Sequence, residues 1–203
     1  MRVFIVGRDA VVEQMYLRRK FEITDRPTEA DIIQFIGGAD INPELYGEHR
    51  LSCTAMNPPD DVRDLTVWRS ATPKQMKIGI CRGGQFLNVM NAGAMWQHVG
   101  GHGVHQGHEI EDVLFKRKMV ATSTHHQMMI PAADGAEVLA FARNLSTNHK
   151  TAHPAGRDHD GIDPEVIFYE RTNTLCFQPH PEYYNATTEL QDYFFDCIEF
   201  LKP

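Results

Sequence analysis

The sequence lacks long apolar runs. No segment approaches the ~18 uncharged apolar residues of a membrane-spanning helix, and the first apolar run, Val3 to Val6, is too short for a signal peptide. Cysteine is scarce as well: the chain has four in 203 residues, with no C-x-x-C pair. This usage excludes a zinc knuckle and a secreted disulfide framework. We therefore expect a soluble, cytoplasmic chain with no membrane partner.

Positive charge is also in short supply. The formal net charge is −7, whereas a nucleic-acid-binding surface needs clustered Lys and Arg to neutralise phosphates. We expect no nucleic-acid partner. No repeat or linker is visible, and 203 residues with 42% hydrophobic content can bury a core of their own, so we expect a single domain over residues 1–203. The sequence leaves the oligomeric state open, a homo-oligomer included.

Short apolar runs alternate with helical spacing along the chain. Asp9 is a candidate N-cap for a helix through Lys20, and the acidic start at Asp60 predicts another helix with Val62, Leu65 and Trp68 on its apolar face. An amphipathic helix is predicted from Thr187 to the C-terminus. Strands are predicted at 3–6, 21–23, 31–36, 77–80, 118–123, 138–142, 165–170 and 174–177. This order predicts an α/β fold, a mostly parallel sheet with its loops gathered at the C-terminal edge.

Cys81 lies where a predicted strand turns into a helix. Gly79 and Gly83 flank it in a G-x-C-x-G pattern, which is typical of a nucleophile elbow. Such an elbow holds its nucleophile in a sparsely populated backbone conformation, and only glycine lets the strand and the helix approach closely enough. A helix N-terminus also favours thiolate over thiol. The alternative interpretation is a buried core cysteine in a plain loop.

A thiol nucleophile needs a base, and His180 is the best candidate. It follows the apolar run ending at Phe177 and stands between two prolines that stiffen the backbone. Glu182, two residues on, can accept a proton from the second imidazole nitrogen and stabilise the imidazolium. We therefore predict a triad of Cys81, His180 and Glu182.

These residues carry a resemblance to a known family. G-I-C-R-G-x-Q-x-x-N-V from Gly79 and Q-x-H-P-E from Gln178 resemble motifs of the class I glutamine amidotransferases. Gly37–Gly47, which reads G-G-x-D-x-x-P-x-x-Y-G, and H-H-Q at 125–127 are similar to the γ-glutamyl hydrolase branch, the C26 peptidase-like and γ-glutamyl-γ-aminobutyrate hydrolase-like enzymes. The match covers most of the chain. His98 stands in a stretch that departs from the family's usual G-G-x-L-x-Q-D.

The resemblance implies a fold, a reaction and a set of site residues. The fold is a flavodoxin-like three-layer sandwich, and the reaction is hydrolysis of a γ-glutamyl amide in a small-molecule substrate through a glutamyl-thioester. Amides of Gly38 and Arg82 would form the oxyanion hole, where each donor is worth ~3 kcal/mol. The resemblance requires no metal and no organic cofactor. It assigns substrate binding to Gly37, Gln85, His125, His126 and Gln127.

Two histidine-containing stretches remain open to other interpretations. His125 and His126 follow a predicted strand and compete with His180 as the base on sequence grounds alone. In the glycine-rich segment 98–108, the histidines at positions 98, 102, 105 and 108 have a spacing that suggests a metal site. Because no cysteine is nearby and no helix sets their register, we favour a loop at the substrate rim. Segment 144–163 is polar and aperiodic, which indicates a flap or a partner-binding insertion.

Two alternative functions are kept. The first is a glutaminase subunit that passes ammonia to a separate synthetase, because the chain has no synthetase domain of its own. The second is a non-catalytic binding module on the same fold, which a lost triad residue would favour. Cys81, His180 and Glu182 are all present, so the second is the weaker alternative.

Overall fold

The computed structural model describes residues 1–103, 107–152 and 159–202. Within these residues, nine strands form one mixed sheet in the order β2-β1-β3-β4-β13-β12-β10-β7-β8. The first five strands in this order run parallel: β2 (Glu22–Ile23), β1 (Arg2–Val6), β3 (Ile32–Phe35), β4 (Met76–Ile80) and β13 (Thr174–Phe177). The others pair antiparallel: β12 (Ile162–Tyr169), β10 (Glu137–Arg143), β7 (His108–Asp112) and β8 (Lys118–Ala121).

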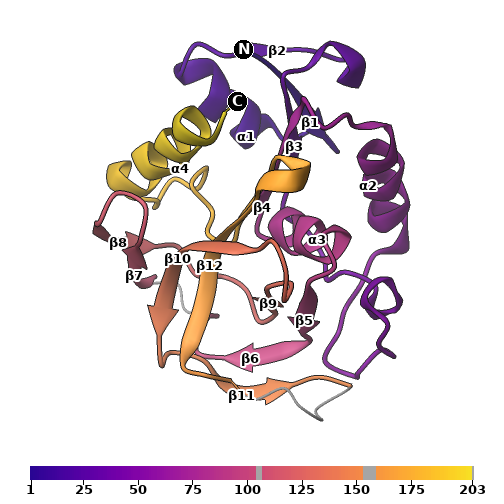
Figure 1. Cartoon of the computed structure of the whole chain (residues 1–203), viewed down its shortest axis with the longest axis vertical. Coiled ribbons are helices and arrows are strands. Elements are labelled where there is room, and N and C mark those ends of the chain that lie inside the picture. Colours follow the sequence, from indigo (N-terminus) through magenta and orange to yellow (C-terminus); the bar gives the residue numbers. More distant parts are fainter. Residues whose placement is uncertain (104–106, 153–158, 203) are drawn as a thin grey trace.

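Helices cover both faces of the parallel half. Figure 1 shows α1 (Ala10–Arg18) and α4 (Thr188–Leu201) on one side of these strands, and α2 (Pro58–Ser70) and α3 (Arg82–Met90) on the other. Each face has its own apolar core: Tyr16 and Phe194 pack on one side, and Phe35 and Phe86 pack on the other. The predicted three-layer α/β sandwich is confirmed, and its parallel strand order is the 2-1-3-4-5 order of flavodoxin-like folds.

Side chains cap the start of two helices, and the sequence predicts the first of these caps, Asp9. The Asp9 carboxylate accepts hydrogen bonds from the backbone N–H of Val11 (2.8 Å) and Val12 (3.0 Å). The Thr187 hydroxyl accepts one from Leu190 N (3.1 Å). Each cap satisfies amides that the helix itself leaves unpaired.

The buried face of helix α2 differs in part from the face that the sequence predicts. Val62, expected to face the core, is 64% exposed. The buried side chains on this helix include two acids, Asp61 and Asp64, at 5% and 1% exposure. Leu65 and Trp68, the other two residues of the predicted apolar face, do pack against the core. The acids are buried because the helix also packs a charged face against a buried cation of α3.

Shorter elements extend the molecule beyond the antiparallel half. β6 (His98–Gly100) pairs with β11 (Thr147–Lys150), and β5 (Ala94–Trp96) pairs with β9 (Met128–Ile130). Segment 144–163, predicted as an aperiodic flap, therefore contains a strand, while its residues 153–158 lie outside the described part. Single 3-10 turns are η1 (Pro27–Glu29), η2 (Pro43–Tyr46) and η3 (Glu170–Thr172). None of the helices in the described ranges combines the length and apolar composition that crossing a membrane requires.

Glycines permit a very close approach between β4 and α3. A Cβ built at Gly79 would lie 2.2 Å from the Gly83 carbonyl carbon. A Cβ at Gly83 would lie 2.6 Å from the Phe35 carbonyl oxygen, and one at Gly84 would lie 2.9 Å from Phe177 N. The three glycines thus let the start of α3 rest directly on the backbone of β3, β4 and β13.

We predict that Gly79→Ala lowers the free energy of unfolding by about 3 kcal/mol or more, because the methyl group meets rigid backbone and forces strand and helix apart. Urea unfolding followed by circular dichroism measures this change. The matched control is Gly103→Ala, whose Cβ would meet its nearest neighbour at 4.0 Å, and we expect it to cost less than about 1 kcal/mol. Equal costs for the two variants would contradict the close-packing account.

Candidate active site

Cys81 joins β4 to α3 in a strained conformation. Its φ is 50° and its ψ is −113°, a region that residues with side chains rarely adopt. The Cys81 N–H donates to the Phe177 carbonyl (2.8 Å), which ties the turn to β13. The strained backbone predicted for an elbow is confirmed. The residue is 8% exposed and precedes the first turn of α3, where unpaired amides favour negative charge.

His180 lies in the loop after β13, hydrogen-bonded to Glu182. The His180 Nδ1 and the Glu182 Oε1 are 2.6 Å apart, which leaves Nε2 for a second partner. His180 is 6% exposed. Burial lowers the pKa of His180, but hydrogen bonds and charge interactions with Cys81 and Glu182 outweigh it and raise the pKa to about 10. The structure therefore favours an imidazolium between a sulfur and a carboxylate.

Two residues that sequence reasoning missed fix the position of His180. Thr122 Oγ1 accepts a hydrogen bond from His180 N (2.6 Å) and donates one to the His180 carbonyl (3.2 Å). The Tyr183 ring stacks on the imidazole, with 4.1 Å between ring centroids and 12° between ring planes. Tyr183 follows the Q-x-H-P-E motif directly, so its position was a usable signal. Thr122 pairs with a residue 58 positions away, and no local sequence pattern predicts such a contact.

The Gly37–Gly38 loop passes close to Cys81 and His180. A Cβ built at Gly37 would lie 3.0 Å from His180 Cε1 and 3.9 Å from Cys81 Cβ. A Cβ at Gly38 would lie 3.1 Å from Arg82 Cδ. The backbone of this loop therefore lies beside Cys81, His180 and Arg82.

Arg82, the residue after Cys81, is held in place by its side chain. Its guanidinium is 2% exposed and pairs with Asp61 (2.5 Å) and Asp64. Arg63 of α2 also pairs with Asp64: its Nε donates to Asp64 Oδ1 (2.8 Å). Asp61 is desolvated, which raises its pKa, and Arg82 offsets this in part. Breaking such a buried pair costs about 3–5 kcal/mol, so the network fixes the start of α3.

Gln85 is turned into the protein. It is 3% exposed, and its Nε2 donates to Gln178 Oε1 (3.0 Å) and to the Gln127 carbonyl (3.3 Å). These contacts link α3 to the loop that precedes His180. A substrate contact from Gln85 would require it to exchange one of these bonds.

The side chains of residues 125–127 contact different parts of the protein. His126 Nε2 lies 3.1 Å from Asp40 Oδ1 in the glycine-rich loop, and its ring neighbours His98. Gln127 is buried, and its Nε2 donates to the Gln97 carbonyl (3.3 Å). His125 packs its ring against His102 instead, and burial lowers the pKa of His125 to about 4. His126 alone of these three side chains has substantial exposure, 41%.

Sequence comparisons connect this chain with glutamine amidotransferases. A family model described as Peptidase C26 matches residues 19–147. A Lactococcus lactis protein named as glutamine amidotransferase-like is 35% identical over 177 residues, 76% of this chain and 67% of the relative. A Mycobacterium tuberculosis protein named as a glutamine amidotransferase is 28% identical over 155 residues, 72% of this chain and 48% of the relative. The chain thus spans about half of the latter, and a match to a Schizosaccharomyces pombe protein covers 34% of that relative.

Solved structures share the fold at low sequence identity. A protein described as a GMP synthase subunit from Thermoplasma acidophilum has a TM-score of 0.65 at 12% identity, covering 99% of this chain and 94% of that one. A glutamine amidotransferase from Thermotoga maritima has a TM-score of 0.62 at 13% identity, with 98% and 83% covered. These likenesses establish the class I amidotransferase architecture.

We predict that Glu182→Gln lowers the pKa of His180, because the neutral amide no longer stabilises the imidazolium. NMR titration of the histidines measures this pKa, and the His180→Gln variant identifies the signal of His180. The raised pKa stabilises the fold fully below the unfolded value of about 6.5, and this contribution is lost as the pH rises through about 10. The stability difference between wild type and Glu182→Gln should therefore shrink as the pH rises toward 10.

Glu189→Gln, on the first turn of α4, is the matched control and should leave the titration of His180 unchanged. A wild-type pKa near the ordinary histidine value, or the same value in Glu182→Gln, would contradict the ion-pair account.

Proposed function

The chain belongs to the peptidase C26 family, and from this premise we propose that it hydrolyses a γ-glutamyl amide bond, releasing glutamate and ammonia or an amine. One observation carries the proposal. Cys81 holds a φ of 50° at the start of α3, and the nearby His180 lies 2.6 Å from a carboxylate oxygen of Glu182. A nucleophile, a base and an orienting acid in this order are what acyl transfer by a thiol requires.

The mechanism has two steps. Cys81 Sγ attacks the γ-carbonyl carbon, and the oxyanion of the tetrahedral intermediate accepts hydrogen bonds from the amides of Gly38 and Arg82. His180 gives its proton to the leaving nitrogen, the C–N bond breaks, and a glutamyl-thioester remains on Cys81. Neutral His180 then removes a proton from water, which attacks the thioester and releases glutamate with the thiolate restored. Glu182 holds the imidazole in place throughout.

The substrate-facing residues follow from the same arrangement. Gly37 borders the imidazole and the thiol, so it is proposed to line the site of the scissile bond. His126 is half-exposed beside Asp40 and is the best placed of the H-H-Q residues to meet a bound ligand. Gln85, Gln127 and His125 are buried, and they are proposed to shape the pocket through the loops that they hold.

A second candidate is a glutaminase subunit that delivers ammonia to a separate synthetase. The observation that favours it is the fold shared with PurLQS from Thermotoga maritima and with the GMP synthase subunit from Thermoplasma acidophilum. The G-G-x-D-x-x-P-x-x-Y-G loop at Gly37–Gly47 favours the hydrolase instead. The two candidates differ in whether the chain turns over without a partner.

We expect glutamate release by the purified protein from glutamine or from one member of a panel of γ-glutamyl-amines. Cys81→Ala should reduce release at least about 1,000-fold, because the acyl acceptor is lost. Cys53→Ala, which removes a partly exposed free cysteine outside the triad, should leave it unchanged. A coupled glutamate assay measures all three proteins.

Release that survives Cys81→Ala would refute the proposed mechanism. Silence with every amide, from a folded protein whose Cys81 reacts with iodoacetamide, would refute the free-standing hydrolase and support the ammonia-delivering candidate.

A further inference from the structure

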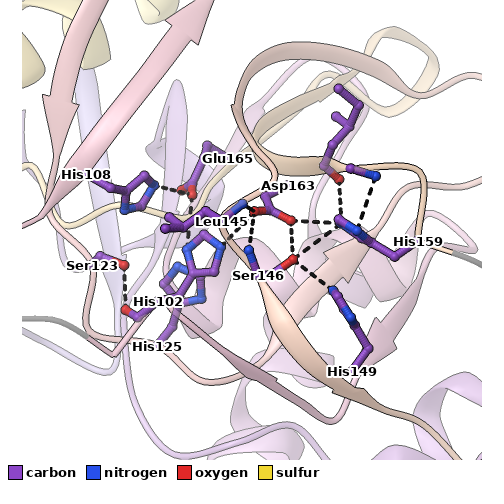
Figure 2. A network of polar contacts seen from close by, with 12 residues as sticks. His102, His108, Ser123, His125, Leu145, Ser146, His149, His159, Asp163 and Glu165 are labelled. Atoms are coloured by element: carbon purple, nitrogen blue, oxygen red, sulfur yellow. Dashed lines mark hydrogen bonds and ion pairs between the residues drawn. The ribbon is translucent and has the colours of Figure 1, made fainter.

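A second cluster of buried polar side chains contains no member of the proposed triad. It gathers residues from the loop after β6, from β7, from the segment after β8 and from β12. Figure 2 shows three imidazoles and two carboxylates of this cluster, with contacts running from His108 through Glu165 and His102 to Asp163. His102 and Glu165 are fully buried, and Asp163 is 1% exposed.

Three of these side chains converge on one point. One nitrogen or oxygen atom from each of His102, His108 and Glu165 lies within 4.8 Å of the other two. Glu165 Oε1 is 3.5 Å from His102 Nδ1 and 2.7 Å from His108 Nε2. Ligands at 2.0–2.2 Å from a tetrahedral zinc ion are about 3.3 Å apart. The His102–Glu165 separation is close to this value, whereas the hydrogen bond between His108 Nε2 and Glu165 Oε1 must open for an ion to enter.

The second nitrogen of His102 is held as in known metal sites. His102 Nε2 lies 3.3 Å from Asp163 Oδ2. If Nε2 donates its proton there, Nδ1 carries a lone pair that points toward the Glu165 carboxylate with no hydrogen bond between them. A lone pair facing an anion is unfavourable unless a cation lies between, and a carboxylate behind a ligating histidine is the usual support.

His125 lies next to these three side chains but does not belong to the group whose donor atoms converge within 4.8 Å. Its Nδ1 donates to the Gln127 carbonyl (2.8 Å), so Nε2 carries a lone pair. That nitrogen is buried and has no hydrogen-bond partner among the described residues. The His125 ring centroid lies 4.6 Å from that of His102. Glu165 Oε2 is likewise buried without a partner in the described ranges. A buried polar atom normally has a partner, which a bound ion or a water molecule can supply.

Charge supports a cation at this position. Asp163 and Glu165 are two buried carboxylates among three imidazoles. Asp163 accepts hydrogen bonds from Leu145 N, Ser146 N and Ser146 Oγ, whereas Glu165 Oε2 has no partner among the described residues. A cation beside Glu165 offsets the cost of burying its charge.

We propose that His102, His108 and Glu165 coordinate a divalent transition-metal ion of the zinc type, with a water molecule completing a four-coordinate shell. Imidazole and carboxylate donors suit zinc, and the burial of His102 and Glu165 places the ion inside the fold. The ion ties the β6–β7 connection to β12 and to the segment after β8. Ser123 of that segment donates to the His102 carbonyl, and Thr122 holds His180.

A neighbouring histidine group is the weaker candidate. His149, His159 and Asp163 also bring their donor atoms within 4.8 Å of one another. However, their atoms already have partners: His149 Nε2 contacts Ser146 Oγ (2.8 Å), and His159 Nε2 contacts Asp163 (2.8 Å) and the Ile162 carbonyl (3.1 Å). None of these donor atoms is a buried atom without a partner, whereas His102 Nδ1 and Glu165 Oε2 of the first group are such atoms among the described residues.

The test titrates zinc chloride into the protein after dialysis against a chelator, with calorimetry as the readout. We expect one ion per chain and no comparable response to magnesium. His108→Gln should weaken zinc binding at least about 100-fold, more than the 10–100-fold that loss of a supporting residue causes. His149→Gln and His98→Gln, which remove histidines outside the three ligands, should bind as wild type.

Two further readouts need no substitution. Cobalt(II) should give the intense visible bands of four-coordinate geometry. Zinc at a free concentration 100 times its dissociation constant should raise the Tm by about 5–10 °C. No zinc binding by wild type, six-coordinate cobalt spectra, or binding lost in His149→Gln but kept in a folded His108→Gln would each overturn the proposal.

Discussion

The contact between β4 and the first turn of α3 is the constraint on which the candidate site depends. Cys81 can hold a φ of 50° because Gly79, Gly83 and Gly84 allow helix and strands to touch backbone to backbone. This contact directs the thiol out of the parallel sheet edge and leaves the amides at the start of α3 unpaired. The nucleophile, its strained conformation and one proposed oxyanion donor therefore arise from a single packing event.

Buried charge then fixes what backbone packing alone would leave loose. Arg82 is held by Asp61 and Asp64 below the thiol, and His180 is held by Glu182 beside it. Each pair is desolvated, so neither partner can leave without exposing the other as an unpaired charge. The pairs made by Arg82 join α3 to α2, and the pair between His180 and Glu182 orders the loop after β13. Together they fix the positions of the nucleophile and the base.

Much of this arrangement was predictable from local patterns. The elbow glycines, the Asp9 cap and the apolar strands each act within a few residues, and the structure confirms them. The acidic face of α2 was not predictable, because the main partner of Asp61 and Asp64 is Arg82, about 20 positions away. Likewise, His102 and His108 meet their carboxylate partner Glu165 only because a distant strand supplies it. Pairings across long sequence separations leave no periodic signal.

The same limit applies to the H-H-Q motif. Sequence resemblance assigned its residues one role, whereas the structure sends His125 to the buried histidine cluster and His126 to the glycine-rich loop. Adjacent residues in extended backbone face opposite sides, so one motif can serve two regions. The segment after β8 thereby connects the candidate active site with the proposed metal site.

The most direct test of the account is covalent labelling with an electrophilic glutamine analogue, followed by peptide mass spectrometry. The account predicts one adduct per chain, located on Cys81, formed at a rate that glutamine or a γ-glutamyl-amine slows by competition. Cys53 is more exposed than Cys81 and serves as the internal control for unselective alkylation. Labelling of Cys53 in preference to Cys81, or no adduct on a folded protein, would contradict the assignment of Cys81 as the nucleophile.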